Sequence, residues 1–429
     1  MTAEVAVLNR IGVALAADSA VTVGSASNKI YTSADKLFQL TSSAPVGVLV
    51  YGNAMLSGVP WETVINAYRR NLKGTNYGTI DDYAASLFSF LTNNFDLFPL
   101  ALQDRNIGGL IYGFLARLRD ELEKRIDQTI QANPNGFITD DDIPPLVETL
   151  ITEQFETIRA ADEIDHLPAG HREKVLAHFR AIIQAGREQI LGTLPIADET
   201  YAKLELMIVE LLVRTHFGPH QGGLVIAGFG EREYAPALIA YKLEEILLGA
   251  VRRKESNRYR IDEKSSAGII PFAQRDPVDN FLQGIDEGMD RFMHRTTHEV
   301  VIGTHDLLLR KLEAIDAVVA TQFSAAVKPE ITEMLKALFA EWKMQKKKFS
   351  ESVLDTVANL PKDELAAMSE ALVNLTKFRG RIMPQRETVG GPIDVAVITK
   401  GDGFVWIRRK HYFEPALNPR ILAPYGKEY

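Results

Sequence analysis

Strand-like sequence falls in three separate parts of this chain, and that separation limits the folds it can adopt. Apolar runs typical of strands occupy residues 4–52, return at 222–230 and close the chain at 392–407. Patterns typical of helices fill the stretches between them. Because a strand must pair with other strands, we expect one sheet core assembled from distant segments, with helices inserted between them.

The first strands begin almost at the amino terminus. Residues 4–8 are mostly apolar, residues 12–17 form a second apolar run, and Asn9-Arg10 provides a short polar turn between them. Two further strands are expected shortly afterwards, at residues 35–40 and 46–52. A chain that enters a sheet within a few residues of its start has an amino terminus that is held in place.

Helix signals fill the rest of the chain. Pro60 suits a first helical turn, and Thr79–Asp82 resembles a capping box that opens another helix. Asp276-Pro277 predicts a helix that continues to Met289. The longest helical patterns are expected at residues 110–130, 145–160, 171–191, 198–215, 330–348 and 363–375. Lys400–Gly403, between two apolar runs, predicts a closing β-hairpin.

These patterns divide the 429 residues into a discontinuous core and two insertions, since the length exceeds that of one typical domain. The core is expected at residues 2–97 and 222–297, and residues 390–429 add the closing strands and a carboxy-terminal tail. A helical insertion is expected at 98–221. A second insertion, or an extended helix layer, is expected at 298–389.

Composition argues against several classes of function. The net charge of −8 and the isoelectric point near 5.7 argue against a dedicated nucleic-acid or acidic-membrane binder. The absence of cysteine excludes disulfides, thiolate catalysis and cysteine-ligated metals. No apolar stretch of about 18 residues occurs, and no signal-peptide pattern is present. We therefore expect a cytoplasmic protein without nucleic-acid or membrane partners.

Thr2 follows the initiator methionine, and threonine is small enough for that methionine to be removed. Removal would place a free α-amine beside the Thr2 hydroxyl. An α-amine has a reference pKa of roughly 7.7–8.0, so part of it is neutral near pH 7 and can act as a general base. The alternative is a threonine at a frayed terminus. The strand that starts at Glu4 favours a buried nucleophile.

Several short segments share a pattern with a known family. They are Thr2–Val7, Gly12–Ser19 with Thr22, Lys36–Phe38 and Gly52, with later strands at 224–228 and 394–398. These segments resemble the β-type subunits of proteasomes and their bacterial relatives, within the N-terminal nucleophile hydrolases. The resemblance covers roughly residues 2–95, 222–295 and 390–410. It implies an α+β fold, a four-layer αββα sandwich, to which this chain adds two long helical insertions.

The resemblance also implies roles for single residues. Thr2 would be the nucleophile, with its α-amine taking the hydroxyl proton directly or through a water. Lys36 would lie beside Thr2, lower the pKa of the amine and stabilise negative charge, and Asp18 would pair with Lys36. The amide of Gly52 would donate to the oxyanion. Thr22 would align an extended peptide through backbone hydrogen bonds.

Apolar residues near these positions predict the substrate preference. Val21 and Val50 are expected to line the pocket for the side chain before the scissile bond, which favours apolar substrates. Taken singly, the site residues also have ordinary structural explanations. Those explanations are a strand-end carboxylate for Asp18, a surface charge for Lys36, a turn glycine for Gly52 and a strand hydroxyl for Thr22.

Two departures from the family pattern concern the groups around the nucleophile. Active members carry a serine- and glycine-rich turn with a nearby aspartate that supports the nucleophile's amine. Here that region reads Lys264–Gly268, and Asp262, Ser265 and Ser266 lie in or near it. Glu4 also stands where a small polar residue is often found.

Histidine spacing gives no strong metal signal. His294 and His298 are four residues apart on an expected helix, but no third ligand has suitable spacing, so two helix-surface histidines are the preferred interpretation. His216 and His220 flank a Gly-Pro turn and are interpreted as turn residues. We expect no metal and no cofactor.

The sequence favours a threonine-type amidohydrolase, specifically a proteasome-like peptidase that acts on peptide or protein substrates through an acyl-enzyme on Thr2. A catalytically inactive scaffold or assembly protein is one alternative. An amide ligase or transpeptidase, which passes the acyl group to an amine, is another. The resemblance implies a homo-oligomer, and the insertions leave a dimer or an open assembly as plausible as a ring.

Overall fold

A computed structural model provides the coordinates, and it describes residues 2–23, 29–41, 43–133, 136–192, 194, 196–218, 221–382, 389–414 and 417–418. The chain divides into two compact units. The first comprises residues 1–33, 260–399 and 405–417, and the second comprises 34–259, 400–404 and 418–429. The expected α+β class is confirmed, because the described residues contain antiparallel sheets and ten α-helices.

A five-stranded sheet forms the centre of the first unit, in the order β12-β1-β2-β13-β14. Its strands are β1 (Ala3–Asn9), β2 (Gly12–Asp18), β12 (Ala267–Ala273), β13 (Ile393–Thr399) and β14 (Gly403–Arg408). A separate two-stranded sheet pairs β3 (Val21–Val23) with β4 (Lys29–Tyr31). The predicted first hairpin and closing hairpin are both confirmed. β1 is an interior strand, with Glu4 opposite Phe272 on one side and Ala17 on the other.

Helices cover one face of this sheet. α10 (Lys362–Ile382) packs against β1, β2 and β13. Val5 and Val7 share a hydrophobic cluster with Leu365 and Val373 of α10. Alternate residues of a strand point to opposite faces, so Glu4 and its alternate neighbours lie on the other face. Every residue of β1 is nevertheless buried, which means that this strand is covered on both faces.

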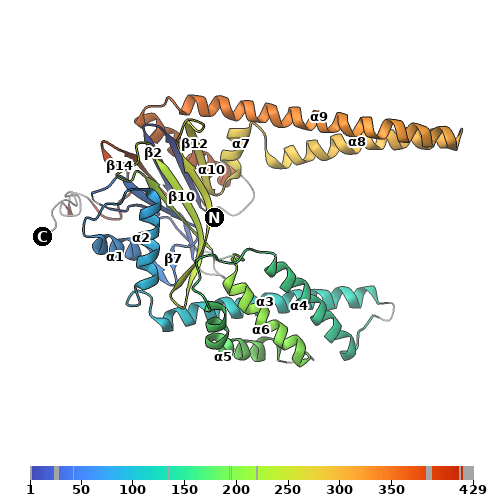
Figure 1. The fold of residues 1–429 in the computed structure, drawn as a ribbon, viewed down its shortest axis with the longest axis horizontal. Helices are drawn as coiled ribbons and strands as arrows, with labels where there is room; N and C mark the ends of the chain where they lie inside the picture. The colour runs from blue at the N-terminus through green and yellow to red at the C-terminus, as the bar shows by residue number, and fades with distance from the viewer. Residues whose placement is uncertain are drawn as a thin grey trace. The chain divides into compact units, whose positions relative to one another are not determined.

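The helix predicted from Asp276 to Met289 is two helices, so that expectation was wrong. α7 (Asp276–Gln283) ends at Gly284, which adopts the left-handed conformation with φ of 71°. α8 (Glu287–Glu313) begins after Asp286, whose side chain accepts hydrogen bonds from the amides of its first turn. α8 then forms a hairpin with α9 (Ala317–Val357), as Figure 1 shows. A strong N-cap two residues after a left-handed glycine therefore overrides continuous helical periodicity.

The second unit is built on another five-stranded antiparallel sheet, in the order β11-β10-β9-β6-β5. Its strands are β5 (Leu37–Gln39), β6 (Val46–Tyr51), β9 (Gly222–Gly228), β10 (Ala237–Leu247) and β11 (Ala250–Arg260), with a small hairpin of β7 (Met55–Leu56) and β8 (Val59–Pro60). No apolar pattern predicts β11, because its last eight residues are mainly charged and polar, and many are exposed. Pairing with β10, rather than apolar alternation, stabilises it as a strand.

Two helices cover one face of this second sheet. α1 (Trp61–Leu72) and α2 (Ile80–Asn93) share a hydrophobic core with β6 and β9. The predicted capping box is present, because Thr79 accepts a hydrogen bond from the Asp82 amide and the Asp82 side chain accepts one from the Thr79 amide.

The long helical stretch between α2 and β9 has its own apolar core. Its helices are α3 (Leu100–Ala132), a 3₁₀ turn η1 (Asp140–Asp142), α4 (Ile143–Arg159), α5 (His171–Leu191) and α6 (Asp198–Val213) (Figure 1). The buried Arg252 of β11 pairs with Glu244 of β10 and donates to the Leu211 and Leu212 carbonyls at 2.8 Å each. The hydrogen bonds from Arg252 to these carbonyls attach the end of α6 to the sheet. Among the described residues, no helix is both long and apolar enough to cross a lipid bilayer.

The turn between β1 and β2 gives a test of how firmly β1 is anchored. The buried Asn9 side chain donates to the carbonyls of Val357 and Leu360, at 2.9 and 2.8 Å, and accepts from the Ile11 amide at 2.9 Å. Asn9→Ala should therefore lower the free energy of unfolding by about 2 kcal/mol, measured by denaturation. Asn71→Ala is the control, since Asn71 is exposed on α1. Equal losses in the two variants would contradict this account.

Candidate active site

Thr2 is incorporated into the sheet rather than left at a frayed end. Its side chain and backbone are only 5% exposed, and β1 begins at the next residue. The Thr2 carbonyl accepts a hydrogen bond from the amide of Gln274 at 3.3 Å. Its hydroxyl donates to a carboxylate oxygen of Glu4 at 3.1 Å. The Thr2 hydroxyl therefore has a defined direction and a defined acceptor.

Asp18 holds the backbone next to Thr2. One of its carboxylate oxygens accepts from the amide of Ala3 at 3.2 Å, and the other accepts from Ala20 at 3.3 Å and Gly390 at 2.9 Å. Asp18 is 1% exposed, so these bonds form away from water. Within the first unit, Thr2 and Asp18 are therefore brought together at one end of the adjacent strands β1 and β2.

Glu4 is the residue whose importance the sequence did not reveal. Its side chain is fully buried and accepts a hydrogen bond from the Thr2 hydroxyl. In the sequence it was only a departure from the family pattern. The available signal was a charged residue inside an apolar strand, two positions from Thr2, where alternation directs both side chains to the same face.

Three predicted site residues, Lys36, Val50 and Gly52, lie in the second unit. Lys36 directly precedes β5, is 6% exposed, and its carbonyl accepts from the Val50 amide at 2.8 Å. Lys36 is therefore not a solvated surface charge. Gly52 ends β6 with φ of 75°, and a Cβ there would lie 2.8 Å from the Gln221 carbonyl oxygen. This position requires glycine on conformational grounds alone.

The predicted substrate-contact residues lie on different elements. Val50 belongs to the hydrophobic core shared with α1 and α2, where its side chain packs among Val48, Trp61 and other core residues. Val21 is half-buried in β3 opposite Tyr31. Thr22 follows it in β3, opposite Ile30, so its backbone lies in a two-stranded sheet.

The serine-rich turn has a structural role of its own. Asp262 accepts from the amides of Lys264 and Ser265 at 2.8 Å each, and its own amide donates to the Ser265 carbonyl at 3.1 Å. Asp262 is exposed. Its carboxylate closes the β11–β12 turn.

Two of the described histidines have structural surroundings. His294 stacks on Phe339 with ring centroids 4.3 Å apart, as expected for a helix residue that packs against α9. Burial, and secondarily the charge of Arg252, lowers the pKa of His216. No group of three or more potential metal ligands occurs in the part of the chain that the structure describes. Met1 and His220 lie outside the described residues.

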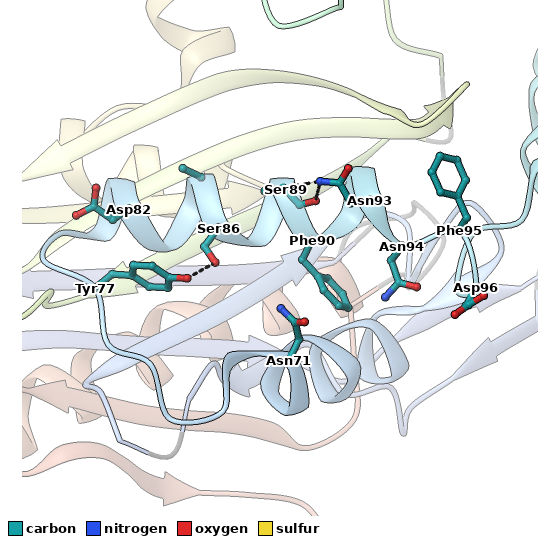
Figure 2. A pocket seen from close by; sticks show the side chains of 11 residues that line it. Asn71, Tyr77, Asp82, Ser86, Ser89, Phe90, Asn93, Asn94, Phe95 and Asp96 are labelled. Atoms are coloured by element: carbon teal, nitrogen blue, oxygen red, sulfur yellow. Dashed lines mark hydrogen bonds between the residues drawn. The ribbon is translucent and has the colours of Figure 1, made fainter.

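A groove of about 930 Å³ lies on the helical side of the second unit (Figure 2). It is lined by residues of α1, α2 and the adjoining loops, and by none of the predicted site residues. Many of its polar side chains bond within the helix layer, such as Tyr77 to Ser86 at 2.8 Å and Asn93 to the Ser89 carbonyl at 2.8 Å. This groove does not contain the chemistry that surrounds Thr2.

The three amides on the Asp18 carboxylate predict a strong effect of Asp18→Asn. An asparagine side chain has one acceptor oxygen, so either orientation directs its NH₂ group at one or more of the three amide donors. We expect a loss of about 2–3 kcal/mol in stability, measured by denaturation. Asp355→Asn, on the exposed surface of α9, is the matched control. A loss no greater than the control's would show that Asp18 does not organise this end of the sheet.

Comparisons with known proteins add one slight likeness. No family model and no curated protein matches the sequence. Among solved structures, the chain is similar to an Anbu (Gly-1) mutant from Hyphomicrobium sp. strain MC1, with 9% sequence identity and a TM-score of 0.32. The match covers 100% of this chain and 99% of that one. A TM-score this low does not define a shared fold, so the site rests on its own geometry.

Proposed function

We propose that this protein is a threonine-type N-terminal nucleophile amidohydrolase, specifically a proteasome-like peptidase that uses Thr2. The observation that carries the proposal is the position of Thr2. It is buried at the start of an interior strand, its hydroxyl is directed to a carboxylate, and Asp18 holds the following amide.

The proposal includes the four-layer αββα sandwich of that superfamily. Within the two units, α10 covers one five-stranded sheet, and α1 with α2 cover the other. Residues 98–221 and 298–389 are the insertions. The support is that β1, β2 and β9 are buried along their whole length although helices cover one face of each sheet. The proposal extends to a cytoplasmic homo-oligomer that takes peptide or protein substrates.

The proposed chemistry is acyl transfer to Thr2. Removal of Met1 frees the α-amine, and the Thr2 oxygen attacks the substrate carbonyl while a base takes its proton. The Gly52 amide and the Lys36 ammonium stabilise the oxyanion. The C–N bond breaks, the leaving nitrogen takes a proton, and water hydrolyses the resulting ester. The burial of Lys36 supports its role, because a buried ammonium must be paired or hydrogen-bonded.

Labelling by a β-lactone tests the nucleophile. The lactone should acylate the wild-type protein once, and peptide mapping by mass spectrometry should place the adduct on Thr2. Thr2→Ala should abolish labelling and peptide hydrolysis in a variant that still folds. Thr321→Ala, on the exposed surface of α9, should leave both unchanged.

The same measurement separates the alternatives. Retained labelling in Thr2→Ala would contradict the mechanism. An unlabelled wild-type protein with Met1 still attached in the intact mass would favour the inactive scaffold. Conjugates formed with an added amine would indicate a transpeptidase.

Lys36 gives a second test of the proposed site. Lys36→Ala should reduce peptide hydrolysis as severely as Thr2→Ala, by at least about 100-fold, because it removes the charge that stabilises the transition state. The control is Lys343→Ala, at an exposed position of α9. A loss of less than about fivefold in a folded Lys36→Ala variant would remove Lys36 from the site.

A further inference from the structure

We propose that the Glu4 carboxylate is the catalytic base that takes the proton from the Thr2 hydroxyl. This inference rests on the proposed function, since Glu4 can act as a base only if Thr2 is the nucleophile. It replaces the α-amine as the direct proton acceptor. The α-amine then lies near the reaction without taking the proton.

The geometry for proton transfer is present in the first unit. The Thr2 Oγ1 atom donates to Glu4 Oε2 at 3.1 Å, which is within the range for a general base. Residues two apart on a strand point to the same face, so the strand itself keeps the two side chains together. β1 pairs on both sides, with Glu4 opposite Phe272 and Ala17. The backbone that carries Glu4 is therefore fixed by two neighbouring strands.

The surroundings of Glu4 favour a functional carboxylate. Glu4 has no exposed surface, and its cross-strand neighbours Ala17 and Phe272 are apolar and also buried. Burying a carboxylate is unfavourable unless hydrogen bonds or charges compensate. The Thr2 hydroxyl provides one such bond, and a bond to an ionised acceptor is stronger than a neutral one. A low-dielectric setting also strengthens the pull of the carboxylate on the hydroxyl proton.

In the proposed mechanism Glu4 carries the proton through both acylation and deacylation. The Oγ–H bond of Thr2 breaks as Oγ bonds to the substrate carbonyl carbon, and the proton moves to Glu4 Oε2. When the tetrahedral intermediate collapses, the C–N bond breaks and Glu4 returns the proton to the leaving nitrogen. The acyl-enzyme is an ester of Thr2. Water then attacks the ester, Glu4 takes a proton from that water, and this proton restores the Thr2 hydroxyl.

The test compares the rate at which a β-lactone modifies Thr2 in the full-length wild type and in Glu4→Gln. Glutamine keeps the size of the side chain and an oxygen that can accept the Thr2 hydrogen bond, but it cannot take up the proton. The second-order rate constant should fall by at least about 100-fold, the usual contribution of a general base. Glu330→Gln, at an exposed position of α9, should react like the wild type. Intact mass reports Met1 removal in each variant, and circular dichroism reports folding.

Each outcome has a distinct meaning. If Thr2 is labelled in the wild type and Glu4→Gln reacts within about threefold, Glu4 is not the base, and the proposed function is unaffected. If the wild type is not labelled at Thr2, the proposed function fails, and the role of Glu4 fails with it. If Glu4→Gln does not fold, Glu4→Asp replaces it. Its shorter carboxylate should slow labelling by at least about tenfold, and a wild-type rate would overturn the proposal.

Discussion

The Asp18 carboxylate is the interaction on which the rest of the proposed site depends. It joins the amide beside Thr2 to the amides of Ala20 and Gly390, which come from different parts of the chain. A carboxylate is suited to this task because its two oxygens accept several hydrogen bonds without contributing a donor. The backbone beside Thr2 is therefore linked through Asp18 to the segments after β2 and before β13. Without that attachment, the Ala3 amide beside Thr2 would lose its carboxylate acceptor.

The interior position of β1 in the sheet also holds the backbone beside Thr2. An edge strand would leave one row of backbone groups to water, whereas β1 pairs with both β12 and β2. Asn9 anchors the far end of the strand through its bonds to Val357 and Leu360. The strand is thus fixed at both ends and on both sides. A rigid strand of this kind can hold Thr2 and Glu4 in one relative position.

Local sequence patterns predicted most elements of the fold. The hairpin around Asn9-Arg10 and the capping box at Thr79 were visible because turn and cap residues act over a few positions. β11 was missed because its stability comes from pairing rather than from its own apolar pattern. In the site, the burial of Lys36 and the bonds of Asp18 depend on distant segments, which residue type alone does not specify. The position of Glu4 beside Thr2 follows from strand alternation and not from the family pattern, in which Glu4 is only a departure.

The most direct test of the central claim is a crystal structure of the protein after reaction with a peptide epoxyketone. We predict continuous electron density from the Thr2 side-chain oxygen into the inhibitor, with Glu4 beside the new bond. Density that joins the inhibitor to another residue, or an unreacted Thr2 in a crystal soaked to saturation, would contradict it.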